Sequence, residues 1–197
     1  MAHMRPALLE VDPQNDFCPG GSLAVKDGDK VVEPLNKMAR EFDKNHWPTF
    51  YSRCWHLEYT RHFAKYGGRW PVHGIMGTKG AQFHPDLWIP KGAYILNKGV
   101  DPSTDAYSAF EGRAFACTFD ELLRQLKVNE LYIGGLATDY CVKNSVLDAL
   151  KKDYLKKVYL LTDACRAVDL NPGDGDRAIE EMRGAGAILT TTDEVLK

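Results

Sequence analysis

The chain has 197 residues, of which 44% are hydrophobic, and this suits a single domain over residues 1–197 with a substantial core. Its net charge of −2, from 25 basic and 27 acidic residues, argues against a nucleic-acid or membrane-surface partner. No apolar run approaches the ~20 residues that span a bilayer, and no signal peptide is recognisable. Residues 1–3 look like a tag remnant, with Met4 as the natural start.

The five cysteines are an odd and scattered set, which argues against a disulfide framework and favours a reducing cytoplasm. They are Cys18, Cys54, Cys117, Cys141 and Cys165. The sequence leaves the oligomeric state open, so a homo-oligomer is compatible with it.

Strand and helix patterns alternate along the chain. Short apolar runs predict strands near 6–11, 47–53, 93–97, 130–135, 157–162 and 187–191. Amphipathic stretches predict helices near 30–45, 118–127, 139–152 and 174–185. This order predicts right-handed βαβ units in an α/β fold, a three-layer α/β/α sandwich with a mainly parallel six-stranded sheet. The irregular stretch 54–92 is long enough to indicate a functional segment.

A glycine pair and a cysteine mark the junction between one predicted strand and the next helix. The glycines at 134–135 end the strand, and Thr138 and Asp139 signal a helix start just before Cys141. The unpaired amides and dipole of a helix N-terminus favour a thiolate, so we expect a depressed pKa and a nucleophilic Cys141. The structural alternative is a buried core cysteine.

An acid and a lysine follow two other predicted strands. Asp12 comes directly after the first apolar run, and Lys98 follows the run 93–96. Each residue alone would more often be a turn or surface residue. Because the carboxyl ends of parallel strands meet in one crevice, we expect Asp12, Lys98 and Cys141 to converge there.

Three histidines and a cysteine lie close together in the irregular stretch. They are Cys54, His56, His62 and His73. Imidazole and thiolate are typical zinc ligands, whereas Fe²⁺ and Mn²⁺ favour more oxygen donors. The remaining histidines, His46 and His84, have no other candidate metal ligand at a suitable spacing in the sequence and are interpreted as structural.

Four segments carry a resemblance to a known family: DPQNDFCPGGSLAV, WPVHGIMGTKGAQFHPDL, NKGVDPSTDAYSAFEG and GGLATDYCVKNSVLDAL. They run from residue 12 to about 150, and DACRAVDLNPGD near the C-terminus also fits. The chain resembles nicotinamidases (pyrazinamidases) of the isochorismatase-like cysteine hydrolases. By position, the resemblance implies that Asp12 is the catalytic acid, Lys98 the lysine and Cys141 the nucleophile.

The resemblance also implies a binding pocket and a metal site. Phe17, Trp70, Tyr107 and Ala137 would surround a flat heteroaromatic ring. The amides of Ala137 and Cys141 would form the oxyanion hole, after a cis peptide bond at 136–137.

The implied metal ligands are His56, His73 and, as in some members of the family, His62. Cys54 stands where the family has a metal-binding aspartate. A thiolate ligand would favour zinc over iron or manganese. Alternatively, the change at Cys54 indicates a weakened site, or no metal at all.

The sequence therefore predicts hydrolysis of nicotinamide, or of a close heteroaromatic carboxamide, to the acid and ammonia through a cysteine thioester. One alternative is another cysteine amidohydrolase of the superfamily, acting on a carbamoyl, ureido or maleamate-type amide. A second alternative is a non-catalytic binding or zinc-storage domain, which would require the Asp12, Lys98 and Cys141 pattern to be accidental.

Overall fold

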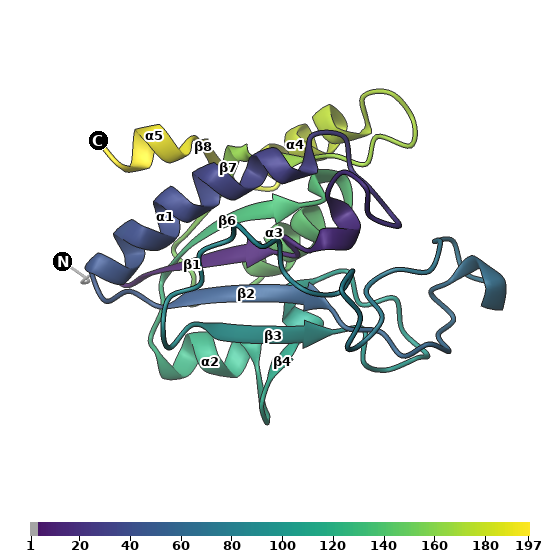
Figure 1. Cartoon of the computed structure of the whole chain (residues 1–197). Helices are drawn as coiled ribbons and strands as arrows, with labels where there is room; N and C mark the ends of the chain where they lie inside the picture. Colours follow the sequence, from purple (N-terminus) through teal and green to yellow (C-terminus); the bar gives the residue numbers. More distant parts are fainter. Residues whose placement is uncertain (1–3) are drawn as a thin grey trace.

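One eight-stranded sheet forms the centre of the computed structural model, which describes residues 4–197 (Figure 1). The interpretation of residues 1–3 lies outside the described residues. Across the sheet the strands are β5 (Cys117–Thr118), β4 (Arg113–Ala114), β3 (Tyr94–Lys98), β2 (Thr49–Cys54), β1 (Pro6–Val11), β6 (Glu130–Leu136), β7 (Lys157–Arg166) and β8 (Ile188–Thr190).

The six strands from β3 to β8 across the sheet are parallel, and β4 and β5 extend the β3 edge in antiparallel fashion. The predicted three-layer α/β fold with a mainly parallel sheet is confirmed, but the strand number of six is corrected to eight. The two added strands are only two residues long each, which is too short for a periodic pattern to reveal them.

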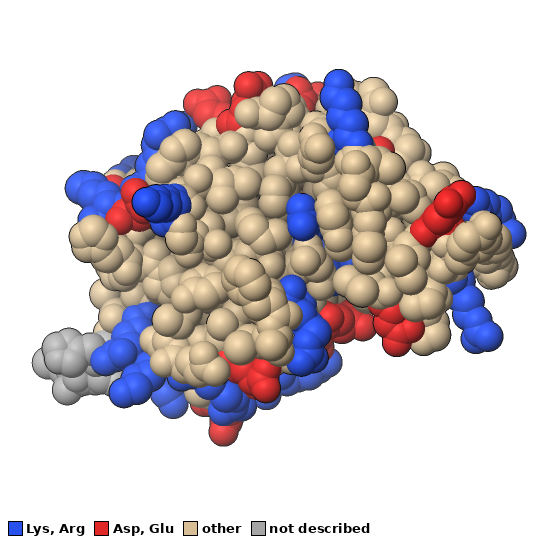
Figure 2. All heavy atoms as spheres, turned by 60° about the horizontal axis from the view of Figure 1, so that its bottom comes forward, with Lys and Arg blue, Asp and Glu red and all other residues tan. Residues whose placement is uncertain are grey.

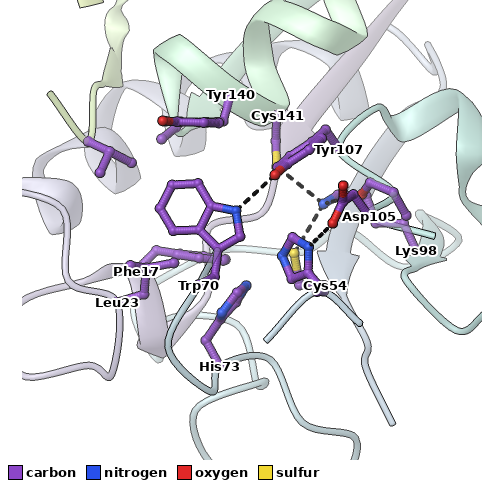
Figure 3. A pocket seen from close by; sticks show the side chains of 14 residues that line it. Phe17, Leu23, Cys54, Trp70, His73, Lys98, Asp105, Tyr107, Tyr140 and Cys141 are labelled. Atoms are coloured by element: carbon purple, nitrogen blue, oxygen red, sulfur yellow. Dashed lines mark hydrogen bonds and ion pairs between the residues drawn. The ribbon is translucent and has the colours of Figure 1, made fainter. Parts of the chain in front are cut away.

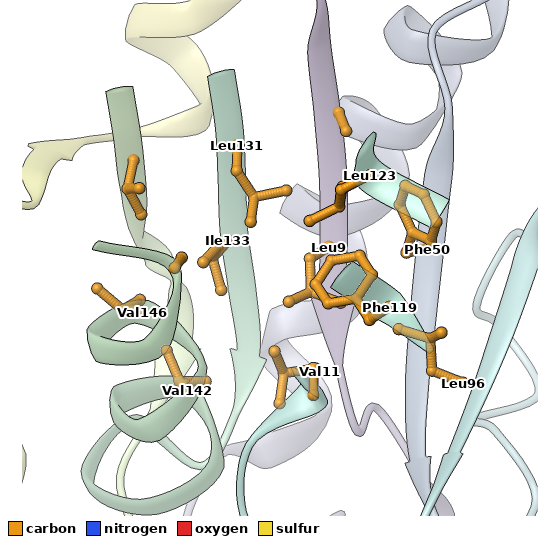
Figure 4. Packing of buried hydrophobic residues seen from close by; sticks show 14 of the residues in the cluster. Leu9, Val11, Phe50, Leu96, Phe119, Leu123, Leu131, Ile133, Val142 and Val146 are labelled. Atoms are coloured by element: carbon orange, nitrogen blue, oxygen red, sulfur yellow. The ribbon is translucent and has the colours of Figure 1, made fainter. Parts of the chain in front are cut away.

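Helices cover both faces of the sheet. Helices α1 (Val32–Lys44) and α5 (Thr192–Val195) lie on one face, where Leu35, Met38 and Phe42 pack against buried strand residues. Helices α2 (Phe119–Gln125), α3 (Lys143–Leu150) and α4 (Asp174–Gly184) pack on the other face. Figure 4 shows this second core, in which Phe119 and Val146 meet residues of β1 and β6.

Short helical turns complete the fold. The 3₁₀ turns are Asn15–Phe17, Gly28–Val31, Ala64–Tyr66 and Ala109–Glu111. The helix predicted from residue 139 begins instead with a π-helical turn, Thr138–Val142, which leads into α3. Such turns recur at functional sites, and this one carries Cys141.

Strands β3, β2, β1 and β6 are neighbours, and their carboxyl ends lie at one edge of the sheet. Close contact of β1 with β6 there depends on Gly135, whose φ is +128° and whose added Cβ would lie 2.1 Å from the carbonyl oxygen of Val11. A side chain at position 135 would push these strands apart, so this glycine fixes how the strand ends are spaced.

None of the helices in residues 4–197 is long and apolar enough to cross a membrane. On the face in Figure 2, basic and acidic side chains are interspersed around a broad uncharged area. This face therefore carries no extended field of one sign.

Candidate active site

Three residues predicted from the sequence meet at the carboxyl edge of the sheet. Asp12 follows β1, Lys98 is the last residue of β3, and Cys141 lies in the π-helical turn after β6. Lys98 Nζ lies 2.7 Å from Asp12 Oδ2 and donates to Cys141 Sγ at 3.3 Å. Because all three are buried, the carboxylate, ammonium and thiol act on one another with little screening by water.

Burial and charge set the ionisation of this cluster. Burial raises the pKa of Asp12 to about 6, although the Lys98 ammonium and a 2.7 Å hydrogen bond from the Ser52 hydroxyl oppose the rise. Burial also disfavours the Lys98 ammonium, but Asp12 and the two neighbouring cysteines more than offset it, so the pKa of Lys98 is raised. At neutral pH Asp12 is therefore ionised and able to accept a proton.

Cys54 lies next to this cluster. Its Sγ accepts from Lys98 Nζ at 3.1 Å and lies 3.7 Å from Asp12 Oδ2. A hydrogen bond between the thiols of Cys141 and Cys54 lowers the pKa of Cys54, and that bond together with burial raises the pKa of Cys141. The pKa of Cys141 is therefore raised in this arrangement and not depressed as expected, because the neighbouring sulfur and the burial outweigh the Lys98 ammonium.

The same cysteine belongs to a group that can hold a metal ion. The ligand atoms of Cys54, His56 and His73 all lie within 4.8 Å of one another, and all three residues are buried. His56 Nδ1 lies 3.2 Å from the carbonyl oxygen of Gly99, and His73 Nδ1 lies 2.8 Å from that of Pro71.

These carbonyl contacts orient both rings so that Nε2 is free to act as a ligand atom. His56 Nε2 is buried and has no hydrogen-bond partner among the described residues. An unpaired buried nitrogen beside a thiol and a second imidazole fits a divalent metal ion.

His62 lies beside this group without being part of it. Its ring stacks on His56 with centroids 4.8 Å apart, and its Nδ1 lies 2.8 Å from Asp105 Oδ1. Burial lowers the pKa of His62 to about 4, so its imidazole is neutral at pH 7. A neutral ring oriented by a carboxylate is typical of metal-ligating histidines.

A small pocket of about 30 Å³ opens above the cysteines (Figure 3). The aromatic residues predicted for it, Phe17, Trp70 and Tyr107, line it together with Ala137. The Trp70 indole N–H donates to the Tyr107 hydroxyl at 2.9 Å, and the Phe17 ring lies 5.4 Å from that of His73. The peptide bond at 136–137, before Ala137, is cis, as the resemblance implies.

Sequence reasoning missed five residues that also line the pocket, namely Leu23, Asp105, Ala106, Tyr140 and Val168. Tyr140 packs its ring edge-on against Trp70 at 4.7 Å, and Asp105 orients His62. Tyr140 directly precedes Cys141, so its position was a usable signal. Asp105 lies in an irregular segment with no pattern of its own. His46 and His84 are not among the residues that line this pocket.

The isochorismatase domain family matches residues 6–194, which is nearly the whole chain. The chain belongs to this family. Its similarity to the nicotinamidase of Escherichia coli strain K12 is 41% identity over 202 residues, covering 94% of each protein.

Two solved structures are similar to this one over nearly its whole length. The pyrazinamidase of Pyrococcus horikoshii in complex with zinc superposes with a TM-score of 0.85 at 38% identity, covering 95% of this chain and 99% of that one. PnC1 from L. infantum in complex with nicotinate superposes with a TM-score of 0.83 at 30% identity, covering 96% of this chain and 94% of that one.

Proposed function

We propose that this protein hydrolyses nicotinamide, or a close heteroaromatic carboxamide, to the carboxylic acid and ammonia. The observation that carries the proposal is the contact of the Lys98 ammonium with both Asp12 and Cys141 at the floor of an aromatic pocket. The nicotinamidase and the nicotinate complex among the relatives support the substrate class. They favour it over the carbamoyl, ureido or maleamate-type amides of the alternative hypothesis.

The reaction begins at Cys141. Asp12, ionised at neutral pH, accepts the thiol proton, and Lys98 stabilises the resulting thiolate. The sulfur then attacks the carboxamide carbon, and the carbonyl electron pair moves onto the oxygen. We assign the backbone amides of Ala137 and Cys141 to this oxyanion.

Ammonia leaves when the carbon–nitrogen bond breaks and Asp12 returns the proton to nitrogen. The product at this stage is a thioester on Cys141. Asp12 then removes a proton from water, and the oxygen attacks the thioester carbon. The carbon–sulfur bond breaks, the Cys141 sulfur takes the proton back from Asp12, and the acid product leaves as the carboxylate after losing its proton to solvent.

The aromatic side chains select for a flat ring. Phe17, Trp70 and Tyr107 form the walls of the binding site for a ring that carries the carboxamide. Each aromatic contact contributes about 0.5–1.5 kcal/mol beyond the burial of area. The hydrogen bond from Trp70 to Tyr107 holds two of these walls in place.

Cys54, His56 and His73 would hold a divalent metal ion, with His62 as a fourth donor beside them. Zinc is the metal we favour over iron or manganese, because a thiolate is a soft ligand and a relative binds zinc. When bound, the ion supplies a Lewis acid next to the pocket.

We also propose a single domain and a cytoplasmic location. One sheet takes strands from Pro6 to Thr190, which supports a single domain over residues 1–197. All five cysteines are free of disulfides, which supports a reducing compartment.

Ammonia release from a panel of amides tests the function. Nicotinamide and pyrazinamide should be turned over faster than carbamoyl, ureido and maleamate-type amides. A preference for an acyclic amide would favour the alternative hydrolase. A zinc-storage domain would be favoured if no amide gave ammonia and if the protein bound stoichiometric zinc that a thiol-blocking reagent released.

A further inference from the structure

Two cysteine sulfurs share one ammonium at the floor of the pocket. Lys98 Nζ donates to Cys54 Sγ at 3.1 Å and to Cys141 Sγ at 3.3 Å, and the two sulfurs lie within 4.8 Å of each other. Cys54 ends β2, and Cys141 lies in the turn after β6. The amide hydrolysis described above uses only the Cys141 sulfur as a nucleophile.

We propose that Cys54 and Cys141 form a modification site, at which a peroxide oxidises the two thiols to a reversible disulfide. A disulfide bond of about 2.05 Å requires the sulfurs to approach by less than about 3 Å from their present separation. Because β1 lies between β2 and β6 in the sheet, this approach requires the π-helical turn 138–142 to shift as well as the two side chains to rotate. The Lys98 ammonium contacts both sulfurs and would stabilise the negative charge on whichever sulfur attacks.

The pocket admits the oxidant to Cys141 first. Its volume of about 30 Å³ exceeds the ~10–15 Å³ that one water molecule needs, so a molecule as small as hydrogen peroxide can enter. Cys141 is 9% exposed, whereas Cys54 is 3% exposed. Cys54 lies behind it, where a resolving thiol is needed.

The reaction balances without a further reactant. Asp12 accepts the Cys141 thiol proton, the sulfur attacks one peroxide oxygen, the O–O bond breaks, and hydroxide leaves, which gives a sulfenic acid on Cys141. The Cys54 thiolate then attacks Cys141 Sγ, the S–O bond breaks, and a second hydroxide leaves. With the two thiol protons, the products are one disulfide and two water molecules, and a dithiol reverses the change.

The disulfide would remove two functions at once. It would occupy the nucleophile of the proposed amidase and a donor of the proposed metal site. Without Cys54, the sulfenic acid on Cys141 has no neighbouring thiol and proceeds to the sulfinic acid, which dithiols do not reverse. Cys54 would therefore protect Cys141 from permanent oxidation.

Peptide mass spectrometry tests the proposal independently of amidase activity. The full-length protein is treated with hydrogen peroxide, alkylated to block free thiols and digested with trypsin. Cleavage after Arg53, Arg61, Lys127 and Lys143 gives peptides 54–61 and 128–143, each with one cysteine. We expect these two peptides to be linked after oxidation and separate after treatment with dithiothreitol.

Two variants provide the comparison. Cys54→Ser should accumulate sulfinic acid on Cys141 that dithiothreitol does not reverse, and Cys54→Asp serves if the serine variant does not fold. Cys117→Ser, at a partly exposed position outside the pocket, should form the linked peptides as the parent does. Alkylated Cys54 beside sulfinic Cys141 in the oxidised parent would overturn the proposal, as would loss of the link in Cys117→Ser.

Discussion

Gly99 lies against the metal group, and substitution by alanine should weaken metal binding. Its carbonyl oxygen accepts from His56 Nδ1, and its φ is +73°. An added Cβ would lie 2.3 Å from His56 Cε1 and 2.4 Å from His56 Nδ1. Since these distances are far below van der Waals contact, the His56 ring must move and its hydrogen bond to Gly99 must lengthen.

Gly99→Ala should lower both the stability of the fold and the affinity for metal. The left-handed backbone costs about 1–2 kcal/mol for a residue with a side chain. A chain of this size loses about 2–4 °C in Tm for each kcal/mol. Loss of the group that orients a ligating histidine typically lowers metal affinity by about 10–100-fold.

Gly77→Ala is the matched control, because its φ is +78° and nothing lies within 4 Å of its added Cβ. Without metal, both variants should lose stability in thermal unfolding, and Gly99→Ala should lose more because its Cβ also displaces the His56 ring. Competition with a chromogenic zinc chelator should show the loss of affinity in Gly99→Ala alone. Parent-like zinc affinity in Gly99→Ala, or an equal loss in Gly77→Ala, would refute the reasoning.

Four further predictions concern the reacting and buried acidic groups. Cys141→Ala should lower ammonia release by at least about 10³-fold while Tm is retained; substantial activity would contradict the assignment of the nucleophile. Asp12→Asn and Lys98→Met should each lower kcat by about 10²–10⁴-fold, and the double variant should be little worse. Fully multiplicative losses in the double variant would show that the two residues do not act together. Because Asp12 must be ionised and its pKa is about 6, kcat/KM should fall as the pH drops below about 6; a flat profile down to pH 4.5 would contradict its role as base. Burial raises the pKa of Glu10, although the neighbouring Tyr51 opposes this, so the folded protein holds this proton more tightly than the unfolded chain. Stability from this group is therefore lost as the pH rises above the unfolded value, and Glu10→Gln should lose less Tm than the parent between pH 5 and pH 8; parallel curves would contradict this.

The sequence predicted the fold well where long buried elements carry a clear pattern. β1 is buried along its whole length and reads as an apolar run, and α1 buries residues at helical spacing. The strands β4 and β5 could not be predicted, because two residues carry no periodicity. The π-helical turn at 138–142 was also missed, since its residues resemble an ordinary helix start.

The convergence of Asp12, Lys98 and Cys141 was predictable because each follows a strand of one parallel sheet. The direction of the Cys141 pKa shift was not predictable. It depends on the Cys54 sulfur, which is 87 positions earlier in the chain, and no local sequence pattern reveals that the two sulfurs lie close together. The role of Asp105 beside His62 was hidden for the same reason.

The order of the strands has a consequence for biogenesis. The reacting group combines Asp12, Lys98 and Cys141 from segments that meet only after β6 has inserted beside β1. Contacts between such distant segments form late, because the intervening chain must first be ordered. A nascent chain on the ribosome therefore has no working site until residues beyond 141 have emerged.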